Sequence, residues 1–172
     1  DNLLAATEGL PPGTHVLVAS SDIPLLTPAA VEDFCLRAER SGGDLCYSIV
    51  ERAVMEARFP GSGRSFRHMQ EGDFAGGDLS MATPQLFRTH DRLLRELSGE
   101  RKSAWRLART LGLGIMLRFA TRRLSIAYLE AWASRLLGSP CKAVITPYAE
   151  IAMEVDKPHQ LALVRRILAS RG

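Results

Sequence analysis

Two aspartates that follow apolar segments carry most of the chemistry suggested by the sequence. Asp22 comes shortly after the apolar run Val16–Ala19, and Asp156 comes directly after Ile151–Val155. Runs of this kind favour buried strands, and ligands of open α/β sheets bind beyond the carboxyl ends of such strands. We therefore expect both carboxylates at one edge of one sheet, close enough to share a cation. Mg²⁺ suits such a site because it binds one or two carboxylates together with phosphate oxygens and water.

The residues around both aspartates also allow a purely structural role. Pro24 disfavours a helical conformation at Ile23, so the turn after Asp22 is held open beneath the carboxylate. Aspartate is also a frequent turn-capping residue, and Asp156 lies two positions before Pro158, where it could cap the last helix. Turn capping and helix capping are therefore the alternatives to metal binding.

Other positions have the chemistry to contact a phosphorylated ligand. Gly76 and Gly77 would allow a ligand to approach the backbone closely, although paired glycines are also common in tight turns. Asp78 adds a polar group directly after them. Lys157, next to Asp156, offers a point charge for a phosphate.

The segment 53–75 lacks clear periodicity and contains Pro60-Gly61-Ser62-Gly63, so we predict a loop or hairpin over the site. Its basic side chains, Arg58, Arg64, Arg67 and His68, face either an anionic ligand or the solvent. The sequence does not separate these two possibilities.

The surrounding elements follow from capping residues and periodicity. Thr27 is a good N-cap and Pro28 a good first residue for a helix that Ser41-Gly42-Gly43 ends. Further strands are expected at Asp44–Val50, Leu79–Thr83 and Ala143–Ile145. Further helices are expected at Gln85–Leu97, Ala104–Leu111, Ile126–Leu137 and His159–Ser170, the last with Leu161, Val164 and Leu168 inward, while Gly112–Leu124 fits a strand or a helix.

Length and composition are those of one soluble globular domain. The 172 residues are 46% apolar and 24% charged, with a net charge of +3. The basic residues are spread along the chain beside acidic ones, so we expect no nucleic-acid partner. No stretch is long and apolar enough to span a membrane. Cys35, Cys46 and Cys141 are widely spaced in apolar surroundings, which indicates buried thiols in a reducing cytoplasm.

Three motifs resemble one family. VLVASSDIPLLTPAAVEDF resembles the strand, Asp-x-Pro turn and helix of the MobA-like nucleotidyltransferases, which have the nucleotide-diphospho-sugar transferase fold. FAGGDLSMATPQLF and EIAMEVDKPHQLALV are similar to two later parts of that fold, in the expected order. The glycine-rich phosphate loop with which the family begins has no counterpart in these residues. We therefore expect residues 1–172 to be a single α/β domain, the carboxyl-terminal part of a longer protein, and inactive alone.

The resemblance implies a three-layer fold with a mixed, mainly parallel sheet, whose Leu79–Thr83 strand is antiparallel and whose N-terminal strands are missing. It implies Mg²⁺-dependent transfer of a nucleoside monophosphate from a nucleoside triphosphate to a small phosphorylated acceptor, such as a molybdopterin, a phosphosugar or a phospholactate. Asp22 and Asp156 match its metal-contacting, catalytic positions. The implied substrate-binding residues are Pro24, Arg64, Gly76, Gly77, Asp78 and Lys157. In the family the third residue of the Gly76-Gly77-Asp78 motif is often Asn or another polar group facing the acceptor, so Asp78 is a departure.

Two other functions fit the same residues. A glycosyltransferase of the related fold would need Asp-x-Asp at the strand end, where Ser20-Ser21-Asp22 offers one aspartate. A non-catalytic interaction or regulatory domain would keep the fold without the phosphate loop. By the resemblance, the missing strands would lie beside Val16–Ala19. We therefore expect either a homodimer, through this edge or the helical segment 85–138, or an N-terminal helix folded across it.

Overall fold

One mixed sheet forms the centre of the molecule. The computed structural model describes residues 5–11, 13–89 and 113–170. Within these residues the strand order is β1-β4-β2-β5, and β3 pairs with β4 as well. The strands are β1 (Val16–Ala19), β2 (Leu45–Glu51), β3 (Arg67–Met69), β4 (Gly72–Ala82) and β5 (Cys141–Ile145).

The strand β4 is antiparallel to both of its main neighbours. It pairs with β1 in the register Val18 to Ser80 and with β2 in the register Tyr47 to Ser80, whereas β2 and β5 are parallel. The predicted antiparallel strand is thus confirmed. It begins at Gly72 and not at Leu79, so the paired glycines lie inside a strand and not in a turn.

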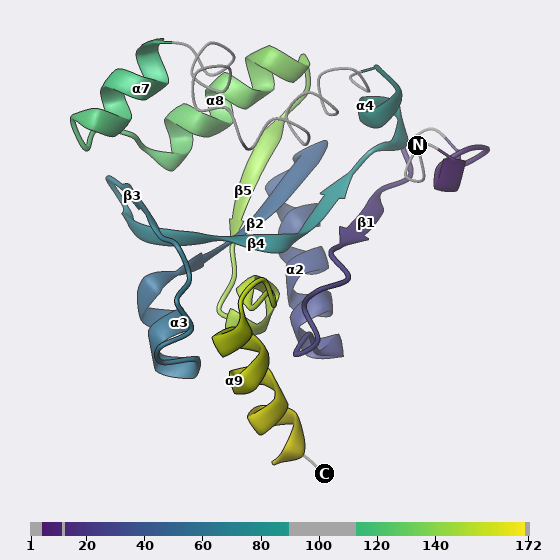
Figure 1. Ribbon diagram of the computed structural model, residues 1–172. Helices are drawn as coiled ribbons and strands as arrows, with labels where there is room; N and C mark the ends of the chain where they lie inside the picture. The colour runs from purple at the N-terminus through teal and green to yellow at the C-terminus, as the bar shows by residue number, and fades with distance from the viewer. Residues whose placement is uncertain (1–4, 12, 90–112, 171–172) are drawn as a thin grey trace.

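Helices lie on both sides of this sheet. Figure 1 shows α7 and α8 on one side, and α2, α3 and α9 on the other. In the described part of the chain the helices are α2 (Pro28–Ser41), α3 (Arg52–Arg58), α4 (Pro84–Thr89), α7 (Leu113–Ala120), α8 (Ile126–Leu137) and α9 (Pro158–Ala169), and η1 (Ala149–Ala152) is a 3₁₀ helix.

Capping residues set the ends of α2 and α8. The Thr27 side chain accepts a hydrogen bond from the Ala30 amide at 3.3 Å, and Gly42 ends α2 in the left-handed conformation, with φ 67°. Ser125 caps α8, and Gly138 ends it with φ 59°. The predicted Ile126–Leu137 helix is confirmed at both ends.

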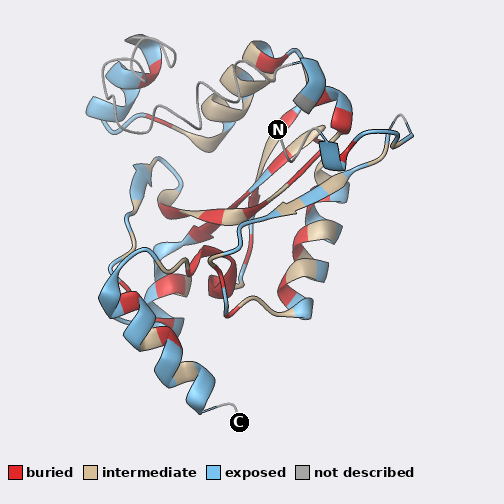
Figure 2. Ribbon diagram, turned by 45° about the vertical axis from the view of Figure 1, so that its right-hand side comes forward, coloured by how far each residue is buried: buried red, intermediate tan, exposed pale blue. Residues whose placement is uncertain are grey.

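The main core lies between the sheet and the helices α2, α3 and α9. Alternate residues of β2 point there: Cys46 and Val50 are fully buried, each in a separate apolar cluster. The first cluster includes Phe34 of α2, and the second includes Met55 of α3 and Val164 of α9. Figure 2 shows this burial as red bands on the inner faces of the helices.

The prediction for residues 53–75 was wrong in its first part. Arg52–Arg58 is the helix α3, because Ala, Met and Glu favour a helix and Met55 is fully buried against the sheet. The remainder includes the predicted hairpin, in which β3 pairs with β4 through Met69 and Gly72. A seven-residue helix is too short for its periodicity to stand out in the sequence.

The predicted strand Ile151–Val155 was also wrong. Residues Ala149–Ala152 form a 3₁₀ helix, and an irregular segment follows it. Ile151, Ala152 and Met153 are fully buried. A short apolar run indicates burial, but it does not indicate which secondary structure is buried.

The orientation of α9 also differs in part from the prediction. Val164 is inward as predicted, but Leu161 and Leu168 are 39% and 43% exposed. Gln160 is buried, and Leu163 and Ile167 pack against the core. The face of α9 that packs against the core is therefore rotated away from the predicted stripe of Leu161, Val164 and Leu168.

The remaining expectations concern the edges of the described structure. Part of Gln85–Leu97 and all of Ala104–Leu111 lie outside the described residues, whereas Gly112–Leu124 contains α7. The outer edge of β1 pairs with no strand in the described part of the chain. The N-terminal residues contact α4, where Arg88 Nη2 donates to the Thr7 carbonyl at 2.7 Å. None of the described helices has the length and apolar character needed to cross a membrane.

Candidate functional site

The Asp22 turn is anchored by its apolar neighbours. Asp22 follows β1 and is partly exposed, while Ile23 and Leu25 are 5% and 0% exposed. Pro24, between them, is exposed. The Ser20 hydroxyl donates to Asp22 Oδ1 at 2.5 Å. The turn is therefore fixed from below and keeps the aspartate at the surface of the site.

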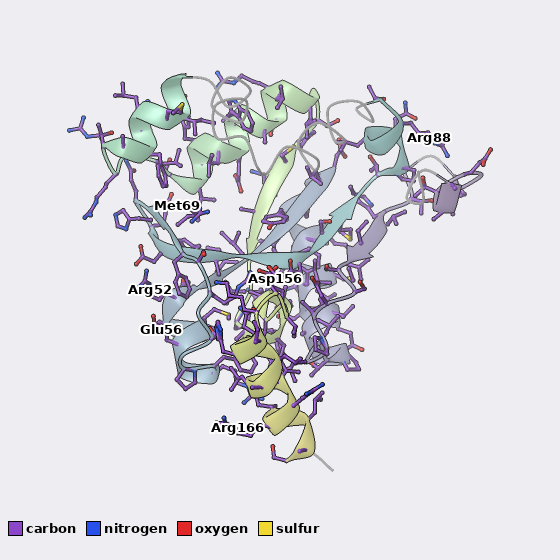
Figure 3. All side chains as sticks on the ribbon, in the orientation of Figure 1. Arg52, Glu56, Met69, Arg88, Asp156 and Arg166 are labelled. Atoms are coloured by element: carbon purple, nitrogen blue, oxygen red, sulfur yellow. The ribbon has the colours of Figure 1, made fainter. Side chains whose placement is uncertain are left out.

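A backbone hydrogen bond joins this turn to the segment that carries Asp156. The Val155 amide donates to the Asp22 carbonyl at 3.0 Å. Asp156 is therefore next in sequence to a residue bonded to Asp22, although it ends no strand. The structure brings the two predicted positions together through an irregular segment. Figure 3 shows Asp156 at the end of α9 that is nearest the sheet.

A glutamine that was not among the predicted site residues holds Asp156 and Lys157 in place. Gln160 is 1% exposed, and its Oε1 accepts hydrogen bonds from the amides of Asp156 at 3.0 Å and Lys157 at 2.9 Å. Its Nε2 donates to the Ser62 carbonyl at 3.2 Å. A Gln three residues after the N-cap of a helix is a known capping signal that could have indicated this role.

Arg64 connects the predicted site residues to one another. Its side chain is 8% exposed; Nη2 donates to the Gly76 carbonyl at 2.9 Å, and Nη1 pairs with Glu154. Glu154 was not predicted, because an acidic residue in an apolar run shows no periodic signal. Arg64 therefore ties β4 to the segment before Asp156. These contacts are structural, so they give no direct support to the predicted role in substrate binding.

The two glycines lie where the backbone is closely packed. A Cβ at Gly77 would collide with Ser48 Oγ and lie 2.9 Å from Ile151 Cγ2, and one at Gly76 would lie 2.7 Å from the Tyr47 hydroxyl. Ser48 Oγ donates to the Leu79 carbonyl at 2.7 Å and accepts from the Leu79 amide at 3.2 Å. The register between β2 and β4 shifts at this point, and the two hydrogen bonds of the Ser48 hydroxyl replace backbone hydrogen bonds between the strands there.

Asp78 lies in the same part of β4. Its carbonyl accepts a hydrogen bond from the Ser20 amide at 3.0 Å. Ser20 therefore bonds both Asp22 and Asp78, and the Asp22 turn, Asp78 and the segment 154–157 form one continuous structure.

Three other basic residues near the candidate site, two of them in the segment 53–75, have protein partners. Arg58 Nε is 3.0 Å from Glu150 Oε1, so this cation is paired. His68 Nδ1 lies 2.8 Å from Asp73 Oδ1, and this hydrogen bond, aided by Arg52, holds the pKa of the Asp73 carboxyl below its ordinary value. Lys157 Nζ donates to the Gly63 carbonyl at 3.4 Å. These contacts account for Arg58, His68 and Lys157 without a ligand.

The donor set fits a hard cation that takes few protein ligands. Asp22 and Asp156 offer carboxylate oxygens only. No cluster of three or more His, Cys, Asp or Glu side chains suited to a metal occurs among the residues described here. Such a set is unlike a closed zinc site and is compatible with Mg²⁺, which keeps water and substrate oxygens as ligands.

The overall α/β fold is similar to that of a solved structure. The chain is similar to a hypothetical transferase structure from Thermus thermophilus, with 39% sequence identity and a TM-score of 0.82 over 93% of this chain and 68% of that one. The chain belongs to the family of that Thermus protein, and this likeness supports a transferase. No protein-family model and no curated protein match the chain.

Proposed function

We propose that the protein is a Mg²⁺-dependent nucleotidyltransferase, which transfers a nucleoside monophosphate from a nucleoside triphosphate to a small phosphorylated acceptor. The observation that carries this proposal is the hydrogen bond from the Val155 amide to the Asp22 carbonyl, because it unites two acidic positions at one end of β1. Similarity to a transferase supports the reaction class. The order of the three motifs supports the nucleotidyl chemistry.

In the proposed reaction, an acceptor oxygen attacks the α-phosphorus of the triphosphate, and pyrophosphate leaves. Positioning and neutralisation of charge supply most of the catalysis in such transfers. Asp22 and Asp156 would hold Mg²⁺, which when bound clamps the phosphates and polarises the α-phosphoryl group. Asp22 is fixed for this role by Ser20 and by the buried side chains of Ile23 and Leu25.

The surrounding residues would position the reactants. Gln160 holds the amides of Asp156 and Lys157, so the aspartate and the lysine keep a fixed spacing. Arg64 fixes the backbone at Gly76, beside which an acceptor can approach β4. Asp78 would orient the acceptor by a hydrogen bond. We propose a cytoplasmic setting, because the free thiols of Cys46 and Cys141 are buried.

The test of this proposal has two stages. Binding of Mn²⁺, as a spectroscopic substitute for Mg²⁺, is measured by electron paramagnetic resonance in the 172-residue chain. Asp22→Asn and Asp156→Asn should each weaken binding at least tenfold, since each removes one of two anionic ligands. Asp44→Asn is the matched control, because Asp44 precedes β2 at the opposite end of the sheet.

The second stage measures catalysis in the product of the complete gene, so that any segment encoded before Asp1 is present. Release of pyrophosphate from each common nucleoside triphosphate is followed with a panel of phosphorylated alcohols. Acceptor-dependent release that requires Asp22 supports the proposal. Equal Mn²⁺ binding by the wild type and both site variants would contradict the metal site.

A further inference from the structure

A cavity of about 470 Å³ separates α8 from the face of the sheet opposite α2. This volume is in the range of small-molecule sites. Its lining is mainly apolar and aromatic and includes Tyr47, Ile49, Phe74, Leu129, Trp132 and Ala143. The apolar and aromatic side chains of α8 therefore border a space large enough for a ligand.

Among the described residues that line this cavity, Arg67 is a cation with no ion pair, whereas Lys142 is paired. Both carboxylate oxygens of Glu130 have partners: Oε2 lies 3.1 Å from Lys142 Nζ, and Oε1 accepts a hydrogen bond from the Ala143 amide at 3.0 Å. Lys142 is thereby neutralised. Arg67 lines the same cavity and has no ion-pair partner within the described part of the chain. A guanidinium in this setting is suited to bind a phosphate.

The cavity adjoins the proposed transfer site at one residue. Gly76 lines the cavity, and its carbonyl accepts the hydrogen bond from Arg64. Phe74, which also lines the cavity, is paired in register with Arg67 across the hairpin. A ligand whose apolar part fills the cavity would therefore lie between the Arg67 hairpin and the glycine pair of β4.

We infer that this cavity binds the acceptor, and that the acceptor is an amphipathic organic phosphate. Its apolar body lies between Trp132 and Tyr47, and its phosphate is bound by Arg67. The identification of this ligand as the acceptor rests on the proposed function. The binding itself depends only on the cavity and on Arg67. A highly polar acceptor such as a free phosphosugar would not match the lining, because it would lose hydration to apolar side chains.

Trp132 provides a direct probe of the cavity. The sequence has two tryptophans, so Trp105→Phe leaves Trp132 as the single reporter. Hexyl phosphate is titrated without nucleotide or metal, and inorganic phosphate and hexanol serve as the two partial ligands. We expect hexyl phosphate to change Trp132 emission saturably and to bind at least tenfold more tightly than either partial ligand.

Variants test the two halves of the site separately. Arg67→Gln should weaken hexyl phosphate about tenfold, as expected for a lost charge-assisted hydrogen bond, and leave hexanol binding unchanged. Arg165→Gln on α9 is the matched control on the other side of the sheet. Ala133→Leu should narrow the cavity and weaken both hexyl phosphate and hexanol. Ala143→Leu does the same from β5 if the α8 variant fails to fold, as judged by circular dichroism.

The outcomes separate this inference from the proposed function. Absence of a saturable change, binding that Arg67→Gln leaves intact, or binding that both cavity-filling variants leave intact would each overturn it. Because no nucleotide or metal is present, binding of hexyl phosphate with no nucleotidyl transfer would support the cavity and reject only the reaction.

Discussion

Asp22 and Asp78 are acidic residues of the candidate site with different proposed roles. Both bond to Ser20, Asp22 through its carboxylate and Asp78 through its carbonyl. Asp22 follows the strand, where it can act on phosphate charge, whereas Asp78 lies within β4. The sequence places both at the site through motif order. It does not reveal that a single serine joins them, because Ser20 has no distinguishing pattern.

Asp22→Asn should lower kcat about 100-fold or more at saturating Mg²⁺, since it removes charge that acts in the transition state. Asp78→Asn should mainly raise the KM for the acceptor, because lost orientation is offset by a higher acceptor concentration. Steady-state kinetics with the complete gene product distinguishes the two effects. A near-normal kcat for Asp22→Asn would contradict a catalytic role for Asp22 and favour the turn-capping alternative.

Residues that were missed at this scale act through long-range contacts. Glu154 pairs with Arg64 and Gln160 bonds Ser62, and these partners are far apart in sequence. Periodicity and local motifs depend only on residues that are close in sequence. They carry no information on a partner ninety positions away.

Among the elements, β4 decides most of the site geometry. Its glycine pair lies against β2, and the two glycines face different neighbours. Gly77 meets Ser48 and Ile151 in the buried core, whereas Gly76 meets the hydroxyl of Tyr47, whose side chain is 46% exposed. The two positions therefore differ in how easily a methyl group can be accommodated.

Gly77→Ala should destabilise the protein by about 1–3 kcal/mol, because Ser48 and Ile151 cannot move without disturbing the core. Gly76→Ala should cost less than about 1 kcal/mol, because the exposed Tyr47 ring can turn aside. Urea unfolding followed by circular dichroism measures both values. Equal losses would mean that the strand backbone, and not the side-chain packing, limits substitution.

The contribution of the β3–β4 hairpin to the stability of the protein should depend on pH. The pKa of Asp73 is lowered by its hydrogen bond to His68 and by Arg52. A carboxyl with a lowered pKa stabilises the folded state above its unfolded pKa, and this contribution is lost as the pH falls through the folded value. Wild type and Asp73→Asn should therefore differ in urea midpoint at pH 7 and converge below pH 3.8, the ordinary value for an aspartate.

The matched control for this comparison is Asp44→Asn, which lies outside the hairpin and should show no such convergence. A constant difference between wild type and Asp73→Asn from neutral to acidic pH would show that the hairpin bond does not depend on the charge of Asp73.

The sequence was most informative for elements with strong end signals. Thr27 with Pro28 marks the start of a helix that the structure confirms, and the helix predicted at Ile126–Leu137 is confirmed as well. It failed for α3 and η1, which are shorter than the window in which periodicity can be recognised. The apolar run after Glu150 was buried as expected, but tertiary packing selected a 3₁₀ helix for it.

At the scale of the whole molecule, two of the three cysteines are enclosed by the fold. Cys46 and Cys141 are buried, and Cys35 is intermediate. Burial raises the pKa of the Cys141 thiol above its ordinary value, and it also raises that of Cys35, with Glu39 adding to the effect. The thiolate, which is the reactive form, is therefore depleted at both positions.

The folded protein at pH 8 should react slowly with a thiol reagent such as dithionitrobenzoate, and all three cysteines should react rapidly in concentrated urea. Cys35→Ser should remove the fastest part of the native reaction, because Cys35 is the most exposed of the three. Rapid native labelling of Cys141 would show that the β5 edge opens readily.

The position of β4 between β1 and β2 also bears on the order of assembly. β1 pairs with β4 and with no other described strand, so its place in the sheet depends on β4. The pairing of β2 with β4 closes a shorter loop than the pairing of β1 with β4, so its entropic cost is lower. Opening should reverse this order, and amides of Val16–Ala19 that donate to β4 should exchange with deuterium at a lower free energy than those of β2. Of the two strands that pair with β4 on either side, the one that delivers Asp22 is thus expected to be secured later and released earlier.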